Sequence, residues 1–147
     1  MLAAAISLGA ICAAAALASQ SSPPALKSPR AGGRVHVGNV RLVVQDPGLV
    51  GHERPVYVAI GPTKKRVRRL AALLGAAGCG PRCDYIALHP WKHHPGKWIV
   101  VAKAPRDGWT RIPGRYFMEA EHVSPPALCG QHGCEIRSAI RSFRVVR

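Results

Sequence analysis

The stretch from residue 55 to residue 88, PVYVAIGPTKKRVRRLAALLGAAGCGPRCDYIAL, contains the elements that decide the fold. Residues 55–60 and 84–88 are short runs rich in β-branched and aromatic residues, which is the pattern of strands. Between them, Thr63 is placed as the N-cap of a helix, because its hydroxyl can accept a hydrogen bond from a free backbone N–H of the first turn. Apolar residues then follow at helical spacing. We therefore predict one α-helix, at about 63–77, between two strands.

Four further segments have a strand-like composition and are separated by Pro-Gly, Asp-Gly and Pro-Pro turn signals. They cover residues 40–45, 97–102, 115–123 and 135–146. Short strands joined by close turns are typical of antiparallel pairing. The predicted class is α+β, a small, mostly antiparallel β-sheet with one α-helix packed on it and disulfides that stabilise it.

The 147 residues leave room for one ordinary domain. Residues 1–18 are apolar and uncharged and end in Ala-Leu-Ala, which predicts a signal peptide; an uncleaved membrane anchor is the alternative. Residues 19–33 are rich in Ser, Pro and Gly and are expected to form a flexible linker. A single globular α+β domain then occupies residues 34–147. The leader predicts a secreted or periplasmic protein.

Four cysteines follow the leader: Cys79, Cys83, Cys129 and Cys134. An even number of cysteines in a small exported domain favours disulfides. We favour the local pairs, Cys79 with Cys83 and Cys129 with Cys134, because turn-forming residues lie between the partners. Cross-pairing would close longer loops and is left open. A structural zinc site is the competing interpretation of the same spacing.

The charge balance indicates an anionic partner. The chain has 21 Lys and Arg residues against 7 Asp and Glu, a formal net charge of +14, and such a charge favours polyanions or acidic surfaces. Basic residues crowd the start of the predicted helix, where positive charge opposes the helix dipole. A solvated basic face without a function is the simpler alternative. The candidate anion-binding residues of the helix are Lys64, Lys65, Arg68 and Arg69. Two more candidates, Lys92 and Lys97, lie further along the chain, in the segment 89–98.

The decapeptide HPWKHHPGKW, residues 89–98, contains a Pro-Gly turn pair between two predicted strands, so we interpret it as a hairpin loop. Its histidines are expected at the exposed tip. Imidazoles are common metal ligands, and an alternative metal site would use His89, His93 and His94 together with His132.

Catalytic signatures are sparse: the chain has no G-x-S-x-G, H-E-x-x-H or Gly-rich phosphate-loop motif. Glu119 and Glu121 would lie on one face of a strand, about 7 Å apart, a spacing open to general acid and base work, with His122 directed to the other face. A surface pair whose charge is balanced by Arg137 or Arg141 is the simpler interpretation.

These observations favour a small exported basic protein that binds an anionic surface or partner, and they favour a binding protein over an enzyme. No cofactor is predicted. Two alternatives remain open, a histidine-based metal-binding protein and a small hydrolase that uses the paired glutamates. The chain has no zinc-finger, RNA-recognition or KH signature, so we do not expect sequence-specific binding of nucleic acid. Membrane contact is expected only through an uncleaved leader.

Overall fold

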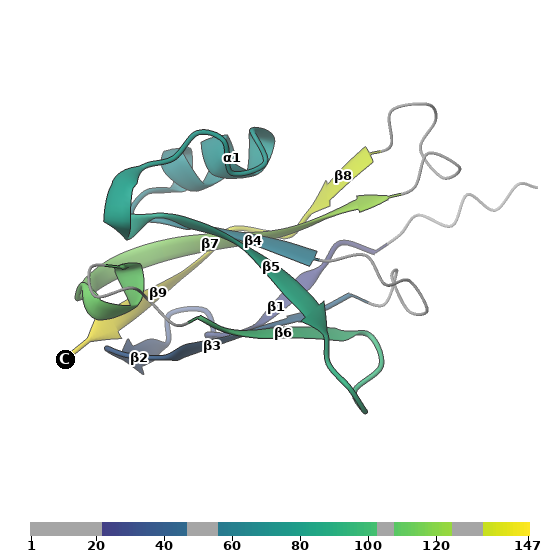
Figure 1. The fold of residues 1–147 in the computed structure, drawn as a ribbon, viewed down its shortest axis with the longest axis horizontal. Helices are drawn as coiled ribbons and strands as arrows, with labels where there is room; N and C mark the ends of the chain where they lie inside the picture. The colour runs from purple at the N-terminus through teal and green to yellow at the C-terminus, as the bar shows by residue number, and fades with distance from the viewer. Residues whose placement is uncertain (1–21, 47–55, 103–107, 125–133) are drawn as a thin grey trace, which may run out of the picture.

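The structure is a computed structural model that describes residues 22–46, 56–102, 108–124 and 134–147. These segments form one curled, mostly antiparallel sheet of nine strands with an α-helix on its outer face (Figure 1). This architecture confirms the predicted α+β class. The predicted signal peptide, residues 1–18, lies outside the described residues. Within the described part of the chain, no helix has the length and apolar character needed to cross a bilayer.

The strands follow one another along the chain with α1 (Lys64–Ala72) after the fourth. They are β1 (Ala25–Ser28), β2 (Arg34–His36), β3 (Val40–Gln45), β4 (Val56–Gly61), β5 (Asp84–Pro90), β6 (Lys97–Ala102), β7 (Gly114–Ser124), β8 (Cys134–Arg137) and β9 (Arg141–Val146). Two short 3-10 turns, η2 (Gly80–Arg82) and η3 (Trp109–Arg111), complete the described elements.

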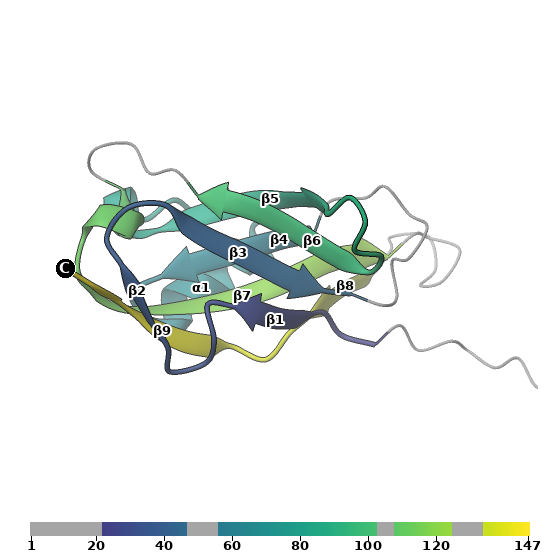
Figure 2. The ribbon, with the colours of Figure 1, turned by 90° about the horizontal axis from the view of Figure 1, so that it is seen from below.

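The sheet order is β1-β3-β6-β5-β4-β7-β9-β2, with β8 paired beside β7. The pairing of β2 with β9 is parallel, whereas the other strand pairs are antiparallel. Figure 2 shows β3 between β1 and β6. Because the sheet curls, the strands around β3 and the strands around β7 enclose a common apolar core.

The core is formed by side chains that alternate along each strand toward the inside of the curl. Leu42 and Val44 of β3 and Met118 of β7 are almost fully buried there. Near η3, three aromatic rings contact one another with centroids 5.8–6.0 Å apart. They are Trp109, Tyr116 and Phe143.

The helix begins where the sequence predicts. The backbone N–H of Arg66 donates to Thr63 Oγ1 at 3.3 Å, which satisfies one of the free donors of the first turn. Val67, Leu70 and Ala71 are buried against the outer face of the sheet. This apolar stripe is what holds α1 to β4 and β7.

The helix ends at Ala72, earlier than the predicted residue 77. Leu74 takes a left-handed conformation, with φ of 47°, and its N–H donates to the carbonyl of Ala71 at 3.1 Å. The N–H of Gly75 donates to the carbonyl of Leu70 at 2.8 Å. This pair of hydrogen bonds is the Schellman motif, which stops a helix.

Leu74→Gly is expected to raise the free energy of unfolding by about 1 kcal/mol, because a left-handed conformation is unfavourable for every residue with a Cβ. Little burial is lost, since Leu74 is 55% exposed. Chemical denaturation measures the change. Leu73→Gly is the matched control, because Leu73 is similarly exposed but has φ of −106°. A control variant that gains as much stability would contradict the explanation.

The sheet also includes part of the segment 19–33, which the sequence predicts to be a flexible linker. β1 lies within residues 19–33 and pairs with β3 at one edge of the sheet. Leu26 is the large apolar side chain of this segment, and it is buried in the core at 2% exposure. The described sheet therefore includes Ala25–Ser28 despite its Ser- and Pro-rich surroundings, because burial of one leucine and a ladder with β3 stabilise this strand.

The predicted strand 135–146 is divided into β8 and β9 by a β-bulge. Glu121 lies opposite Arg137, and Met118 lies opposite Arg141, so three steps along β7 match four steps along the partner. Ser138 still lies opposite Ala120, because its N–H donates to the carbonyl oxygen of Ala120 at 2.8 Å and its Oγ accepts a hydrogen bond from the N–H of Ala120 at 2.9 Å. The extra residue therefore lies between Ser138 and Arg141. A one-residue register shift of this kind is a β-bulge.

Cys79 and Cys83 form a disulfide, as the local pairing predicts, with their Cα atoms 5.4 Å apart. The bridge spans η2 and joins the end of the helical region to the start of β5. Cys129 and the side chain of Cys134 lie outside the described residues, so their pairing stays a prediction.

Candidate functional site

Five exposed basic residues line the solvent side of α1, and we call them the basic face. They are Lys64, Lys65, Arg66, Arg68 and Arg69. The buried stripe of Val67 and Leu70 fixes which side of the helix faces the sheet, and this directs the basic side chains outward. Four of the predicted anion-binding residues are therefore gathered on one surface.

A hollow of about 390 Å³ lies beside the basic face, between the first turns of α1 and the loop after the helix. Its basic lining residues are Lys65, Arg66 and Arg69, and Gly78 and Cys79 form the opposite wall. Arg66 Nη1 donates to the carbonyl oxygen of Cys79 at 3.5 Å. Since the Cys79–Cys83 bridge tethers this loop, the wall of the hollow is covalently held.

No described carboxylate lies within ion-pair distance of the basic face; the described ion pairs involve other residues. The first turn of α1 also has no acidic residue. The charge of Arg68 interacts with Glu119 from beyond ion-pair distance, so the positive charges at this helix start are only partly balanced within the described structure.

The hairpin between β5 and β6 confirms the predicted loop, and it lies at the end of the molecule away from α1 (Figure 1). Lys92 and Lys97 therefore form a second positive surface and do not join the basic face. The ring of Trp91 packs on that of His94, with centroids 4.0 Å apart.

The candidate metal ligands His89, His93 and His94 are exposed on this hairpin. His132, the fourth, lies outside the described residues. Among residues that the structure describes, no three His, Cys, Asp or Glu side chains gather as a metal site would require.

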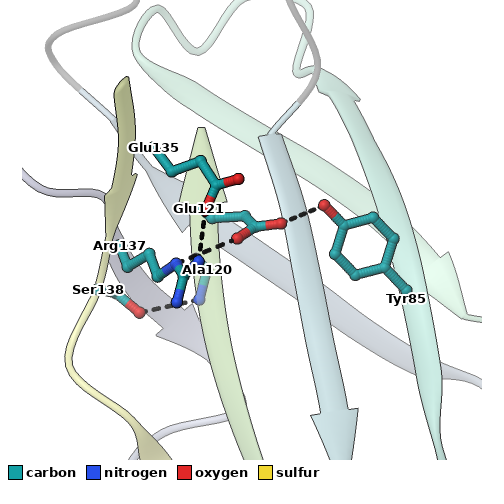
Figure 3. Close-up of polar contacts among 6 residues, drawn as sticks. All are labelled: Tyr85, Ala120, Glu121, Glu135, Arg137 and Ser138. Atoms are coloured by element: carbon teal, nitrogen blue, oxygen red, sulfur yellow. Dashed lines mark hydrogen bonds and ion pairs between the residues drawn. The ribbon is translucent and has the colours of Figure 1, made fainter. Parts of the chain in front are cut away.

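The paired glutamates lie on the outer face of β7 but are buried, unlike the surface pair that the sequence favours. Glu119 is 6% exposed and Glu121 is fully buried. Figure 3 shows the hydroxyl of Tyr85 directed at Glu121, to which it donates a hydrogen bond, and Arg137 on the other side. Arg137 Nε lies 3.5 Å from Glu121 Oε2. Of the two predicted partners, Arg137 is the one in contact.

Burial raises the pKa of both carboxyl groups. For Glu119, desolvation raises the pKa, and the charges of Arg137 and Arg68 oppose it. For Glu121, desolvation again raises the pKa, and the hydrogen bond from Tyr85 opposes it. Arg137 also pairs with Glu135. The hollow beside the basic face and a second one between β5 and β6 have other lining residues, so these two hollows give the carboxyl groups no substrate cleft.

The inner face of β7 carries a polar contact that the sequence analysis did not find. His122 points into the core, opposite to Glu121, and its Nδ1 is hydrogen-bonded to Oδ2 of Asp46 at the end of β3. Both side chains are fully buried. The alternation of Tyr116, Met118 and His122 on one side of the strand is a sequence signal for an inward histidine, but nothing local indicates Asp46 as its partner.

Comparisons with known proteins do not identify this chain. No protein-family model matches it, and no curated protein matches it. A crystal structure of an engineered protein is similar over 86% of this chain, with 12% sequence identity and a TM-score of 0.48. The match spans 20% of that engineered chain. This similarity is too low to inform the function, which has to be argued from the basic face and the other described surfaces.

Proposed function

We propose that the protein is exported and binds an anionic surface or partner through the basic face of α1. The observation that carries the proposal is the concentration of exposed positive charge in the first turns of α1, beside a hollow and without a described carboxylate in contact. Cations near a helix N-terminus cost about 0.3–1 kcal/mol each at low salt. An anionic ligand would offset that cost on binding.

The hollow gives the surface a shape as well as a charge. Lys65, Arg66 and Arg69 converge on it from one side, and arginine presents several N–H donors in a planar fork that fits sulfate, phosphate or carboxylate oxygens. A polyanion with charged groups at regular intervals would place one group in the hollow and others along the outer residues.

The hairpin residues Lys92 and Lys97 are expected to act as a separate contact. Because the hairpin lies away from α1, reversal of its charges should add to, and not replace, the effect of changes on the helix.

Reversal of Lys64, Lys65, Arg68 and Arg69 to Glu is expected to weaken heparin binding by at least about tenfold and to flatten its salt dependence, because fewer counterions are released on contact. Isothermal titration at several salt concentrations measures both effects. The matched control reverses four exposed arginines on the N-terminal segment and β9: Arg30, Arg34, Arg141 and Arg144.

Both variants change the net charge equally. If the control loses as much affinity as the helix variant, the basic face is not the specific site. If wild-type protein shows no salt-dependent binding to heparin, dextran sulfate or anionic vesicles, the proposed function is wrong.

A further inference from the structure

The strands β5 and β6 separate soon after the hairpin that joins them (Figure 1). Their ladder consists of two pairs, His89 with Ile99 and Pro90 with Trp98. Beyond these pairs β5 follows β4, and β6 follows β3. In the described sheet, the backbone from Asp84 to Leu88 therefore has a strand partner on one side only.

A cleft of about 450 Å³ occupies this separation. Ile86 and Ala87 line it from β5, and Val100 and Val101 line it from β6. Val101 is 42% exposed, which is unusual for a β-branched apolar residue in this sheet. The cleft thus combines two strand edges with small apolar side chains.

Trp109 and Thr110 of η3 also line the cleft. The indole Nε1 of Trp109 donates to Asp84 Oδ2 at 3.2 Å, which holds η3 against the start of β5. Thr110 is fully buried, yet within the described structure its Oγ1 has no hydrogen-bond partner. A buried hydroxyl without a partner is unfavourable, so this group is suited to a polar atom that enters the cleft.

The outer edges of the sheet offer less to a partner strand. β1 is four residues long with a register irregularity between Leu26 and Ser28, and β2 has three residues. Short, irregular edges discourage strand addition. The edge of β5 is longer, regular and next to a cleft.

We propose that this cleft binds an extended peptide segment of a partner protein, which adds as a strand alongside β5. The unpaired backbone groups of β5 would supply main-chain hydrogen bonds, and alternate apolar side chains of the peptide would enter between Ile86 and Val100. Two exposed arginines are close in the chain to residues that line the cleft: Arg82 is two residues before Asp84, and Arg111 directly follows Thr110. The carboxylate of Asp84 also lines the cleft, but both of its oxygens already accept hydrogen bonds, from the N–H of Tyr85 and from Trp109 Nε1. The two arginines outnumber it, so the charge favours acidic residues at the ends of the peptide.

This proposal is independent of anion binding by α1, and one titration tests it. The probe is the pentapeptide Ac-Asp-Val-Thr-Val-Asp-NH2, titrated into the ¹⁵N-labelled protein and followed by NMR. We expect saturable shifts of the backbone amides of Asp84–Leu88 and Val100–Ala102. The absence of saturable shifts at millimolar peptide, or shifts confined to α1, would overturn the proposal and leave the proposed function unaffected.

Two variants test the mode of binding. Thr110→Val should weaken peptide binding by about tenfold, the equivalent of one lost hydrogen bond, while it raises the melting temperature of the free protein. If Thr110 had only a structural role, the substitution would not lower the peptide affinity while it raises the melting temperature. A variant that binds the peptide as well as wild type would show that Thr110 Oγ1 does not contact it.

Val101→Glu should abolish peptide binding, and Val37→Glu is its matched control, because Val37 is 40% exposed and is not one of the residues that line the cleft. Equal loss in both variants would show that the acidic probe responds to charge and not to the cleft. Sedimentation of the free protein adds a last check. A dimer that Val101→Glu dissociates would make the occupant a second copy of this chain and contradict a separate partner.

Discussion

His122→Leu is expected to lower the free energy of unfolding by about 1–3 kcal/mol, because it removes the buried hydrogen bond between the imidazole and the carboxyl group of Asp46. Small domains have a total stability of about 5–15 kcal/mol, so a loss of this size is readily measured. Leucine is similar in size to the imidazole, which keeps the cavity contribution small. Chemical denaturation followed by circular dichroism measures the change.

The matched control for this prediction is His36→Leu. His36 is exposed and lies in β2, where its Nδ1 is 3.2 Å from the carbonyl oxygen of Arg147, so its replacement should change stability by less than about 0.5 kcal/mol. A double-mutant cycle of Asp46→Asn with His122→Leu should give a coupling energy of at least about 1 kcal/mol. Additive effects would show that the contact between the two side chains contributes nothing.

Glu119→Gln should have the opposite sign and stabilise the protein at neutral pH by about 1–3 kcal/mol, because the neutral amide avoids the desolvation cost of a buried carboxylate. Glu119 Oε2 is buried and has no hydrogen-bond partner in the described structure. Burial raises the pKa of this carboxyl group, so the folded state binds its proton more tightly than the unfolded state does. The resulting stability is present below the pKa of the unfolded chain and is lost as the pH rises through the raised pKa.

The gain from Glu119→Gln should therefore be small near pH 4 and should increase toward pH 7. Denaturation of wild type and variant at a series of pH values measures it. Glu135→Gln is the contrasting variant, because the exposed carboxylate of Glu135 pairs with Arg137 and its neutralisation removes that ion pair, which should give no gain in stability. A gain that is constant with pH would contradict the assignment to an ionised Glu119.

The sequence predicts those parts of the fold that depend on neighbouring residues. The strands at 40–45 and 97–102 match β3 and β6, because β-branched runs bounded by turn residues determine them locally. The start of α1 is predicted by the capping hydroxyl of Thr63. The end of α1 is not predicted, because Leu74 takes a left-handed backbone conformation that is usually occupied by glycine.

The candidate site shows the same division. The positive charge of the basic face can be predicted from the sequence, because its five basic residues lie close together in the chain. Strand alternation places Glu119 and Glu121 on one face of β7, but it does not reveal that other elements cover that face, and this is why the surface expectation fails for these two residues. Asp46 and His122 are far apart in the chain. Their contact depends on the curl of the sheet, which no local pattern encodes.

The β-bulge between Ser138 and Arg141 determines which insertions and deletions this protein can tolerate. Arg137 faces the outer surface toward Glu121, whereas Phe143 faces the core beside Tyr116. Both numbers are odd, and in an uninterrupted strand residues an even number apart lie on the same side. The extra residue reverses this parity. Loss of one residue between β8 and β9 would turn either the arginine inward or the phenylalanine outward, so the length of this short connection is constrained even where its composition is free to vary.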